Sequence, residues 1–228
     1  MITQTTYFVK DEILDRLKKV DIDVDFKLPL NKPTGNFFYD PWIIKDEYKD
    51  TVWNDLLNTV PTNIGEARLI KLSPGQAYRS HADMDDRYHF NIRGERSFII
   101  YTDANLIYPQ TISNYWYDMD AGEIHSAVNT GRIDRIQLVV RKLLYKNNLN
   151  NFSEVIVTVK NTSPDYRYVF DELYSPWLNR ANKRGILNNF CYNNGTVSFN
   201  IDNNYIDELK EIKSSYFNLS VGGVLANL

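Results

Sequence analysis

Hydrophobic and polar residues follow different periods in successive parts of the chain. In residues 1–63, apolar side chains recur at helical spacing over 8–20 and again over 42–60. Pro41 stands where proline suits a helix start, and the Pro/Gly/Asn-rich stretch 29–35 is typical of a loop. We therefore expect residues 1–63 to form a helical region that packs on a larger core.

Residues 64–145 show the short alternating runs that are typical of strands. Turn signals such as Ser73-Pro74-Gly75 and Asn129-Thr130-Gly131 separate these runs. The pattern predicts strands over 67–72, 77–82, 88–92, 97–102, 115–119, 124–128 and 133–140. Such a series favours a β-sandwich or jelly-roll core over residues 64–145, with the N-terminal helices covering one outer face.

The last part, residues 146–228, opens with an Asn-rich linker and mixes both periods. We expect a strand at 155–159, a helix at 168–183, a β-like stretch at 190–201 and a helix at 205–216. This α/β segment contains no cluster of ionisable residues that suggests chemistry. Two roles stay open for it: a packing or dimerisation appendage, which would make a homodimer, or a lid for substrate recognition.

Composition restricts the class of protein. The chain has 228 residues, is 43% hydrophobic and 14% aromatic, and carries a net charge of −3 with both signs interspersed. These values support a packed core and argue against nucleic-acid or membrane-surface partners. There is no apolar run near the roughly 20 residues that span a bilayer. The N-terminus lacks a signal-peptide layout and Cys191 is the single cysteine, so we expect a cytoplasmic protein.

All three histidines lie between residues 81 and 125. His81 and Asp83 are two residues apart at the end of an expected strand, so their side chains would point to one face. His125 from another strand would complete two nitrogens and one oxygen around a metal. That donor set is the 2-His-1-carboxylate arrangement of non-haem Fe(II) oxygenases. Taken singly, each residue is more often a core or surface side chain, but the spacing of the set favours a metal site.

A polar strand face follows the histidine cluster. Arg135 and Gln137 alternate with Ile136 and Leu138, which suits a strand with a polar cavity on one side and helices on the other. A buried guanidinium needs an anionic partner. A dicarboxylate co-substrate would serve, and so would an Asp or Glu of the chain.

Three further sets of residues are candidates for the same cavity. Arg87 and His89 form a polar face on another expected strand, and we place His89 beside the metal ligands because Asp83 already partners His81. Arg141 shares a strand face with Arg135, so it is a candidate for binding a substrate carboxylate or else a surface charge past the strand end. Trp116, with Tyr78 and Tyr115, would line the cavity or pack in the core.

Together these motifs resemble the aspartyl/asparaginyl β-hydroxylase superfamily of Fe(II)/2-oxoglutarate-dependent dioxygenases. The resemblance covers about residues 64–142 and rests on His81-Ala-Asp83, Arg87-Tyr-His89, Asp120-Ala-Gly-Glu-Ile-His125-Ser-Ala-Val-Asn129 and Arg135. It implies a double-stranded β-helix (jelly roll, cupin-like) core. It further implies iron held by His81, Asp83 and His125, and 2-oxoglutarate bound through its distal carboxylate by Arg135, with help from Arg87 and His89.

One departure from the family pattern narrows the resemblance. The animal aspartyl/asparaginyl hydroxylases carry glycine at the position of Asp83, so the chain looks closer to the full-triad, proline-hydroxylase-like branch. Asp83 also argues against a halogenase, which needs that position vacant for a halide. The activity that the resemblance implies uses O2 to hydroxylate a C–H of an amino acid or of a peptidyl side chain, with succinate and CO2 as co-products.

Two other function classes stay open. The first is a catalytically inert jelly roll that serves as a binding or assembly module. The second is a cupin metalloenzyme that does not use 2-oxoglutarate. The intact triad and Arg135 argue against the inert module. The cupin metalloenzyme would not need Arg135, so replacement of this residue separates it from the oxygenase.

Overall fold

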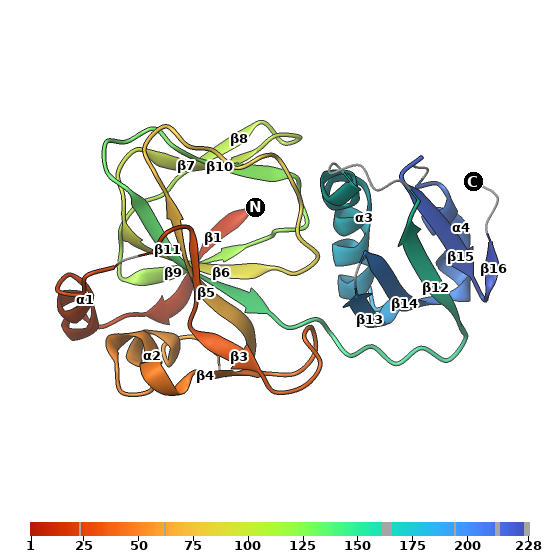
Figure 1. Ribbon diagram of the computed structural model, residues 1–228, viewed down its shortest axis with the longest axis horizontal. Helices are drawn as coiled ribbons and strands as arrows, with labels where there is room; N and C mark the ends of the chain where they lie inside the picture. Colours follow the sequence, from red (N-terminus) through yellow and green to blue (C-terminus); the bar gives the residue numbers. More distant parts are fainter. Residues whose placement is uncertain (23, 62, 161–165, 194, 213–214, 226–228) are drawn as a thin grey trace. The chain divides into compact units, whose positions relative to one another are not determined.

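The chain forms two compact units in the computed structural model (Figure 1), which describes residues 1–22, 24–61, 63–160, 166–193, 195–212 and 215–225. The first unit contains Met1–Ser80 and Asp85–Leu143. The second contains Leu144–Leu228 together with the four residues His81–Met84. In sequence, these four residues lie between the two segments of the first unit. The fold is mainly β with flanking helices, as expected.

Two antiparallel sheets form the body of the first unit (Figure 1). The larger has the strand order β1-β9-β6-β11-β5-β2 and the smaller has the order β10-β7-β8. The strands of the larger sheet are β1 (Ile2–Phe8), β2 (Lys27–Pro29), β5 (Ile64–Leu72), β6 (Arg87–Arg93), β9 (Tyr115–Met119) and β11 (Arg135–Lys142). Those of the smaller are β7 (Ser97–Tyr101), β8 (Leu106–Pro109) and β10 (His125–Asn129). Strands β3 (Asn31–Pro33) and β4 (Trp42–Ile44) form a separate pair.

The strand order is that of a jelly roll. Strand β11 pairs with both β5 and β6, and β10 pairs with β7, so strands that are distant in sequence become neighbours across two facing sheets. Alternation along each strand then sends one set of side chains between the sheets and the other outward. One apolar cluster on the inner side contains Leu72, Ile99, Tyr101, Met119 and Ala127.

The outer side of the larger sheet is covered by helical segments of the N-terminal region (Figure 1). These are α1 (Asp11–Leu17), the 3-10 turn η1 (Asp46–Tyr48) and α2 (Val52–Leu57). Leu56 of α2 is fully buried in the same core as Leu69 and Leu138. The Oγ1 of Thr51 accepts a hydrogen bond from the backbone N–H of Trp53 at 3.3 Å, which caps the start of α2.

The N-terminal region contains less helix than its periodicity predicts. The expected helix 8–20 is shorter because the preceding residues pair with β9 as strand β1. The expected helix 42–60 is divided into β4, η1 and α2, and part of the expected loop 29–35 forms β3. Strand pairing at a sheet edge satisfies backbone groups that a marginal helix would otherwise satisfy, and it overrides a weak local preference.

The strand predictions in the core are confirmed with two exceptions. The segment 77–82 forms an isolated bridge between Ala77 and Val128 rather than a regular strand, and the sequence pattern did not indicate β8. Residues Gln76 and Tyr78 still exchange backbone hydrogen bonds with β10. The loop that follows therefore leaves from the edge of the smaller sheet.

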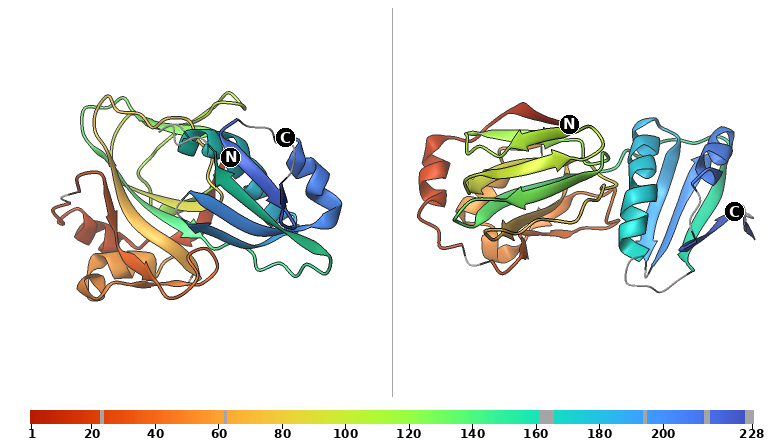
Figure 2. Two further views of the ribbon diagram at one scale, coloured as in Figure 1. Left: turned by 45° about the vertical axis from the view of Figure 1, so that its right-hand side comes forward. Right: turned by 90° about the horizontal axis from the view of Figure 1, so that it is seen from above.

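The second unit is an α/β layer around a five-stranded sheet (Figure 2). The sheet has the order β13-β14-β12-β15-β16, and a long helix packs on one face of it. The elements are β12 (Phe152–Val159), α3 (Tyr166–Lys183), β13 (Leu187–Asn193), β14 (Thr196–Asp202), η2 (Asn203–Tyr205), α4 (Ile206–Lys210), β15 (Phe217–Val221) and β16 (Val224–Leu225). Alternate residues of β14 are buried, and Trp177 of α3 lies against Phe199 with ring centroids 6.3 Å apart.

None of the helices in the described part of the chain combines the length and apolar character that a membrane-crossing helix needs.

Candidate active site

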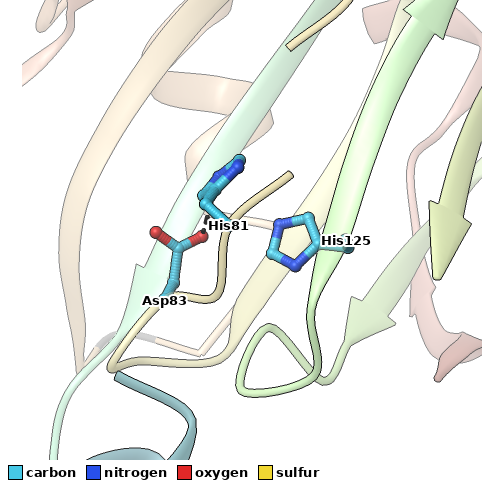
Figure 3. A group of neighbouring side chains, drawn as sticks. All are labelled: His81, Asp83 and His125. Atoms are coloured by element: carbon cyan, nitrogen blue, oxygen red, sulfur yellow. Dashed lines mark ion pairs between the residues drawn. The ribbon is translucent and has the colours of Figure 1, made fainter. Parts of the chain in front are cut away.

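His81, Asp83 and His125 come together as a group of candidate metal ligands (Figure 3). One ligand atom of each residue lies within 4.8 Å of those of the other two. His125 begins β10, whereas His81 and Asp83 lie in the loop that leads into β6. His81 Nε2 and Asp83 Oδ2 are 3.8 Å apart. The residues that the sequence singled out for a metal site are therefore neighbours in space.

A backbone contact fixes the orientation of the His125 ring. Its Nδ1 lies 2.8 Å from the carbonyl oxygen of Glu123. A carbonyl can only accept, so Nδ1 carries the hydrogen and the neutral ring presents its Nε2 lone pair. This is the arrangement that metal-binding histidines commonly adopt. His125 is buried, and its ring lies 5.9 Å from that of Tyr101.

The loop that carries His81 and Asp83 is held through its backbone within the second unit. The N–H of Ala82 donates to the carbonyl of Asp171 at 3.0 Å. The Nδ2 of the buried Asn179 donates to the carbonyl of Met84 at 3.1 Å and approaches that of Asp83 at 3.4 Å. These bonds involve only backbone groups of the loop and none of the two ligand side chains. Sequence reasoning missed Asn179, because nothing local relates α3 to this loop.

Arg135 is a buried cation surrounded by amides. It is 2% exposed, and Gln110 Oε1 accepts from its Nε at 3.1 Å and from its Nη2 at 2.6 Å. Its Nη2 also donates to Gln137, which in turn donates to Asn91 and Gln110. Among the described residues, no carboxylate lies within ion-pair distance of Arg135, so it has no salt bridge to an Asp or Glu there. Burial lowers the pKa of Arg135 to about 10.

Gln110 is a second functional candidate that the sequence did not reveal. Asn91 and Gln137 alternate with apolar neighbours on β6 and β11, so the period of two could have identified them. Gln110 follows the end of β8 and has no such signal. Only the pairing of distant strands brings its amide to Arg135.

Two of the remaining predicted residues, Arg87 and His89, lie on the larger sheet. Arg87 and His89 lie on β6, opposite Arg141 and Val139 of β11. His89 is buried and is not part of the ligand group described above. Arg87 Nε donates to Asp85 Oδ1 at 3.3 Å.

The two candidates for substrate contact, Arg141 and Trp116, differ in their positions. Arg141 belongs to β11 and is 4% exposed, so it is not a surface charge beyond the strand end. Trp116 is fully buried in the core on the helical side of the sheet. Its Nε1 donates to Thr59 Oγ1 at 2.8 Å and its ring lies 5.2 Å from Phe90. Trp116 therefore packs in the core and does not line the cavity.

Comparison with known proteins finds only distant structural likenesses. No protein-family model and no curated protein sequence matches the chain. A cupin domain from Bordetella pertussis Tohama I is 8% identical with a TM-score of 0.32, over 53% of this chain and 97% of that one. A Pseudomonas putida prolyl-4-hydroxylase is 14% identical with a TM-score of 0.34, over 61% and 90%. At these values, the likeness carries no information about activity.

Proposed function

We propose that the chain is an Fe(II)/2-oxoglutarate-dependent dioxygenase that hydroxylates a C–H bond of an amino acid or of a peptidyl side chain. The observation that supports this most is a three-ligand group together with a buried guanidinium that has no carboxylate partner among the described residues. A buried cation whose hydrogen-bond partners are neutral amides is costly unless a ligand supplies the anion. The distal carboxylate of 2-oxoglutarate would supply it.

The donor set fits a divalent transition metal. Two imidazole nitrogens and one carboxylate oxygen suit Fe(II) and leave coordination positions for co-substrate and O2. His81, Asp83 and His125 would hold the ion, with the Nε2 of His125 already directed away from its backbone partner. When bound, iron and 2-oxoglutarate supply the oxidation: one atom of O2 enters succinate as CO2 leaves, and the other becomes the substrate hydroxyl.

The chain's own residues bind and orient. Arg135 would bind the distal carboxylate of 2-oxoglutarate through paired N–H donors. Gln110 and Gln137 hold its guanidinium in place before the ligand arrives. Arg87 and His89 would assist from the neighbouring strand. Because Asp83 is present, we further propose that the chain belongs to the full-triad, proline-hydroxylase-like branch of the aspartyl/asparaginyl β-hydroxylase superfamily.

An anaerobic titration tests the proposal. Fe(II) and then 2-oxoglutarate are added to the purified protein while the weak visible charge-transfer band of the chelate is followed. We expect the band in the wild type, its loss in His125→Ala, and its appearance only at much higher 2-oxoglutarate concentration in Arg135→Gln. Lys142→Gln is the matched control, because Lys142 belongs to the same strand but pairs with Asp118.

The same titration separates the other function classes. Metal binding without a band in folded wild-type protein would contradict the oxygenase and favour a cupin metalloenzyme that does not use 2-oxoglutarate. A folded protein that binds no divalent metal would favour an inert binding module. Both outcomes are read from one sample, because metal content and the visible spectrum are measured together.

A further inference from the structure

The guanidinium of Arg141 has one buried edge that no described residue satisfies. Its Nε donates to Asp85 Oδ2 at 2.7 Å, and its Nη2 donates to the same oxygen. Its Nη1 is buried and has no hydrogen-bond partner among the described residues. Buried donors are nearly always bonded, so an unsatisfied Nη1 points to an acceptor that the chain does not provide.

Aromatic rings cover the face of the same guanidinium. The Cζ of Arg141 lies 4.4 Å from the ring centroid of Phe37 and 4.9 Å from that of Phe38. Phe37 also packs edge-on against Trp42 at 5.0 Å and is 43% exposed. The head group is therefore held by Asp85 on one edge and by rings on a face. A partly exposed aromatic ring beside a guanidinium that is held in place provides apolar contact for a small ligand.

The inner face of the larger sheet carries more positive than negative charge. Strand register and alternation place these residues there: Lys27, Glu66, Arg68, Arg87, Arg135 and Arg141. The carboxylate of Asp85 joins them through its bond to Arg141. Under the proposed function, Arg135 would bind 2-oxoglutarate. Arg141 stands six residues away on the same strand, about 20 Å along it. The surplus charge at that end suits a second, separate anion.

Chain connectivity places Arg141 near the candidate metal ligands. Asp85, which it contacts, follows Asp83 by two residues, so the two Cα atoms are at most about 7 Å apart. A carboxylate held by Arg141 would thus be bound beside a residue that is close in sequence to Asp83. Gly65 packs closely against this side chain, because a Cβ there would lie 3.3 Å from the Cβ of Arg141.

We propose that Arg141 Nη1 binds the α-carboxylate of the substrate, with Phe37 and Phe38 against its aliphatic part. The substrate is then a free amino acid or the last residue of a peptide, because an internal residue has no carboxylate at this place. The inference rests on the proposed function and narrows it to substrates that carry a free carboxylate. It makes Arg141 a specificity-determining residue.

Ligand binding without turnover provides the direct test. Protein loaded with Zn(II) and 2-oxoglutarate is titrated with free L-amino acids, with their C-terminal amides and with dipeptides that end in the same residues, and ligand-observed NMR reports binding. We expect at least one acid to bind at least tenfold more tightly than its amide. The dipeptides show whether the carboxylate comes from a free amino acid or from a chain end.

Variants then assign the preference to Arg141. In Arg141→Gln we expect the acid-over-amide preference to fall to about one, with the 2-oxoglutarate band of the Fe(II) protein unchanged. Lys142→Gln should keep the preference. Phe37→Ala leaves the ion pair with Asp85 intact and should weaken acid and amide equally, so it stays informative if Arg141→Gln does not fold.

The outcomes keep the two proposals apart. Absence of the band in the wild type contradicts the proposed function. If the wild type shows the band but binds amides as tightly as acids, the inference about Arg141 is overturned and the proposed dioxygenase function is not affected. The same holds if the wild type shows the band but binds no amino acid or dipeptide. Acid preference that survives in Arg141→Gln also overturns it.

Discussion

A single amide oxygen of Gln110 accepts two hydrogen bonds from the guanidinium of Arg135, at 3.1 Å from Nε and 2.6 Å from Nη2. The residues are 25 positions apart: Arg135 begins β11 of the larger sheet, and Gln110 follows β8 of the smaller one. Gln110 thus orients the buried cation without neutralising it. An amide in this place keeps the charge of Arg135 available for a carboxylate ligand.

Gln110→Glu should convert this neutral support into a competing ion pair. We expect the metal-loaded variant to bind 2-oxoglutarate about 10 to 100 times more weakly, because a charge-assisted bond of about 1.5–3 kcal/mol already occupies Arg135. The ligand-free variant should melt at a higher temperature than the wild type. Calorimetric titration and thermal melts measure both effects. Gln110→Ala, which adds no charge, is the control, and unchanged affinity in Gln110→Glu would contradict the role of Arg135.

Asp83→Ala should weaken binding of divalent metal by at least tenfold and abolish turnover, because one of three ligand groups is removed. Co(II), followed by its visible spectrum, reports the affinity independently of activity. Glu123→Gln is the matched control. Its side chain is exposed, and only its backbone carbonyl contacts His125. Full metal affinity in Asp83→Ala would remove Asp83 from the ligand set.

Asn179→Ala should weaken metal binding about tenfold, because it releases the carbonyl of Met84 and loosens the loop that carries Asp83. Asn182→Ala is the control for stability. Asn182 is equally buried on the same helix, but it bonds the backbone of Tyr145 instead. We expect both variants to lose stability in thermal melts and only Asn179→Ala to lose affinity. Equal affinities would mean that Asn179 has a structural role alone.

Glu66 should make stability depend on pH in the acid range. Burial raises its pKa, but the cations of Arg68 and Lys27 outweigh burial, so the pKa of Glu66 lies below its ordinary value of 4.5. The unfolded chain therefore binds this proton at a higher pH than the native protein does. The stabilisation is present above about pH 4.5 and is lost as the pH falls through the native pKa.

Thermal melts from pH 3 to pH 7 check this expectation. Glu66→Gln should have a lower melting temperature than the wild type at pH 7, and the difference should shrink as the pH falls below about 4.5. Glu12→Gln, a change at an exposed position of α1, should follow the wild-type curve. If the difference in melting temperature between the wild type and Glu66→Gln stays constant from pH 3 to pH 7, the lowered pKa of Glu66 is contradicted.

The N-terminal region shows where sequence periodicity misleads. Apolar spacing over 8–20 and 42–60 predicted two long helices, and the structure contains α1 and α2 with strands β1 and β4 before them. Short helices are marginal by themselves, so available strand partners and burial decide where each one begins and ends. Such partners are distant in sequence and leave no trace in a local pattern.

The sequence by itself determined which side chains share a face of each core strand, because the alternation of β11 and β6 is a local property. It thereby determined that Arg135 faces the inner side, and its spacing of His81, Asp83 and His125 indicated the ligand group. Only the tertiary structure decided that amides, not carboxylates, surround Arg135, that Arg141 is buried against Asp85, and that Trp116 belongs to the outer core. These neighbours come from strands and loops far apart in the chain, and packing alone brings them together.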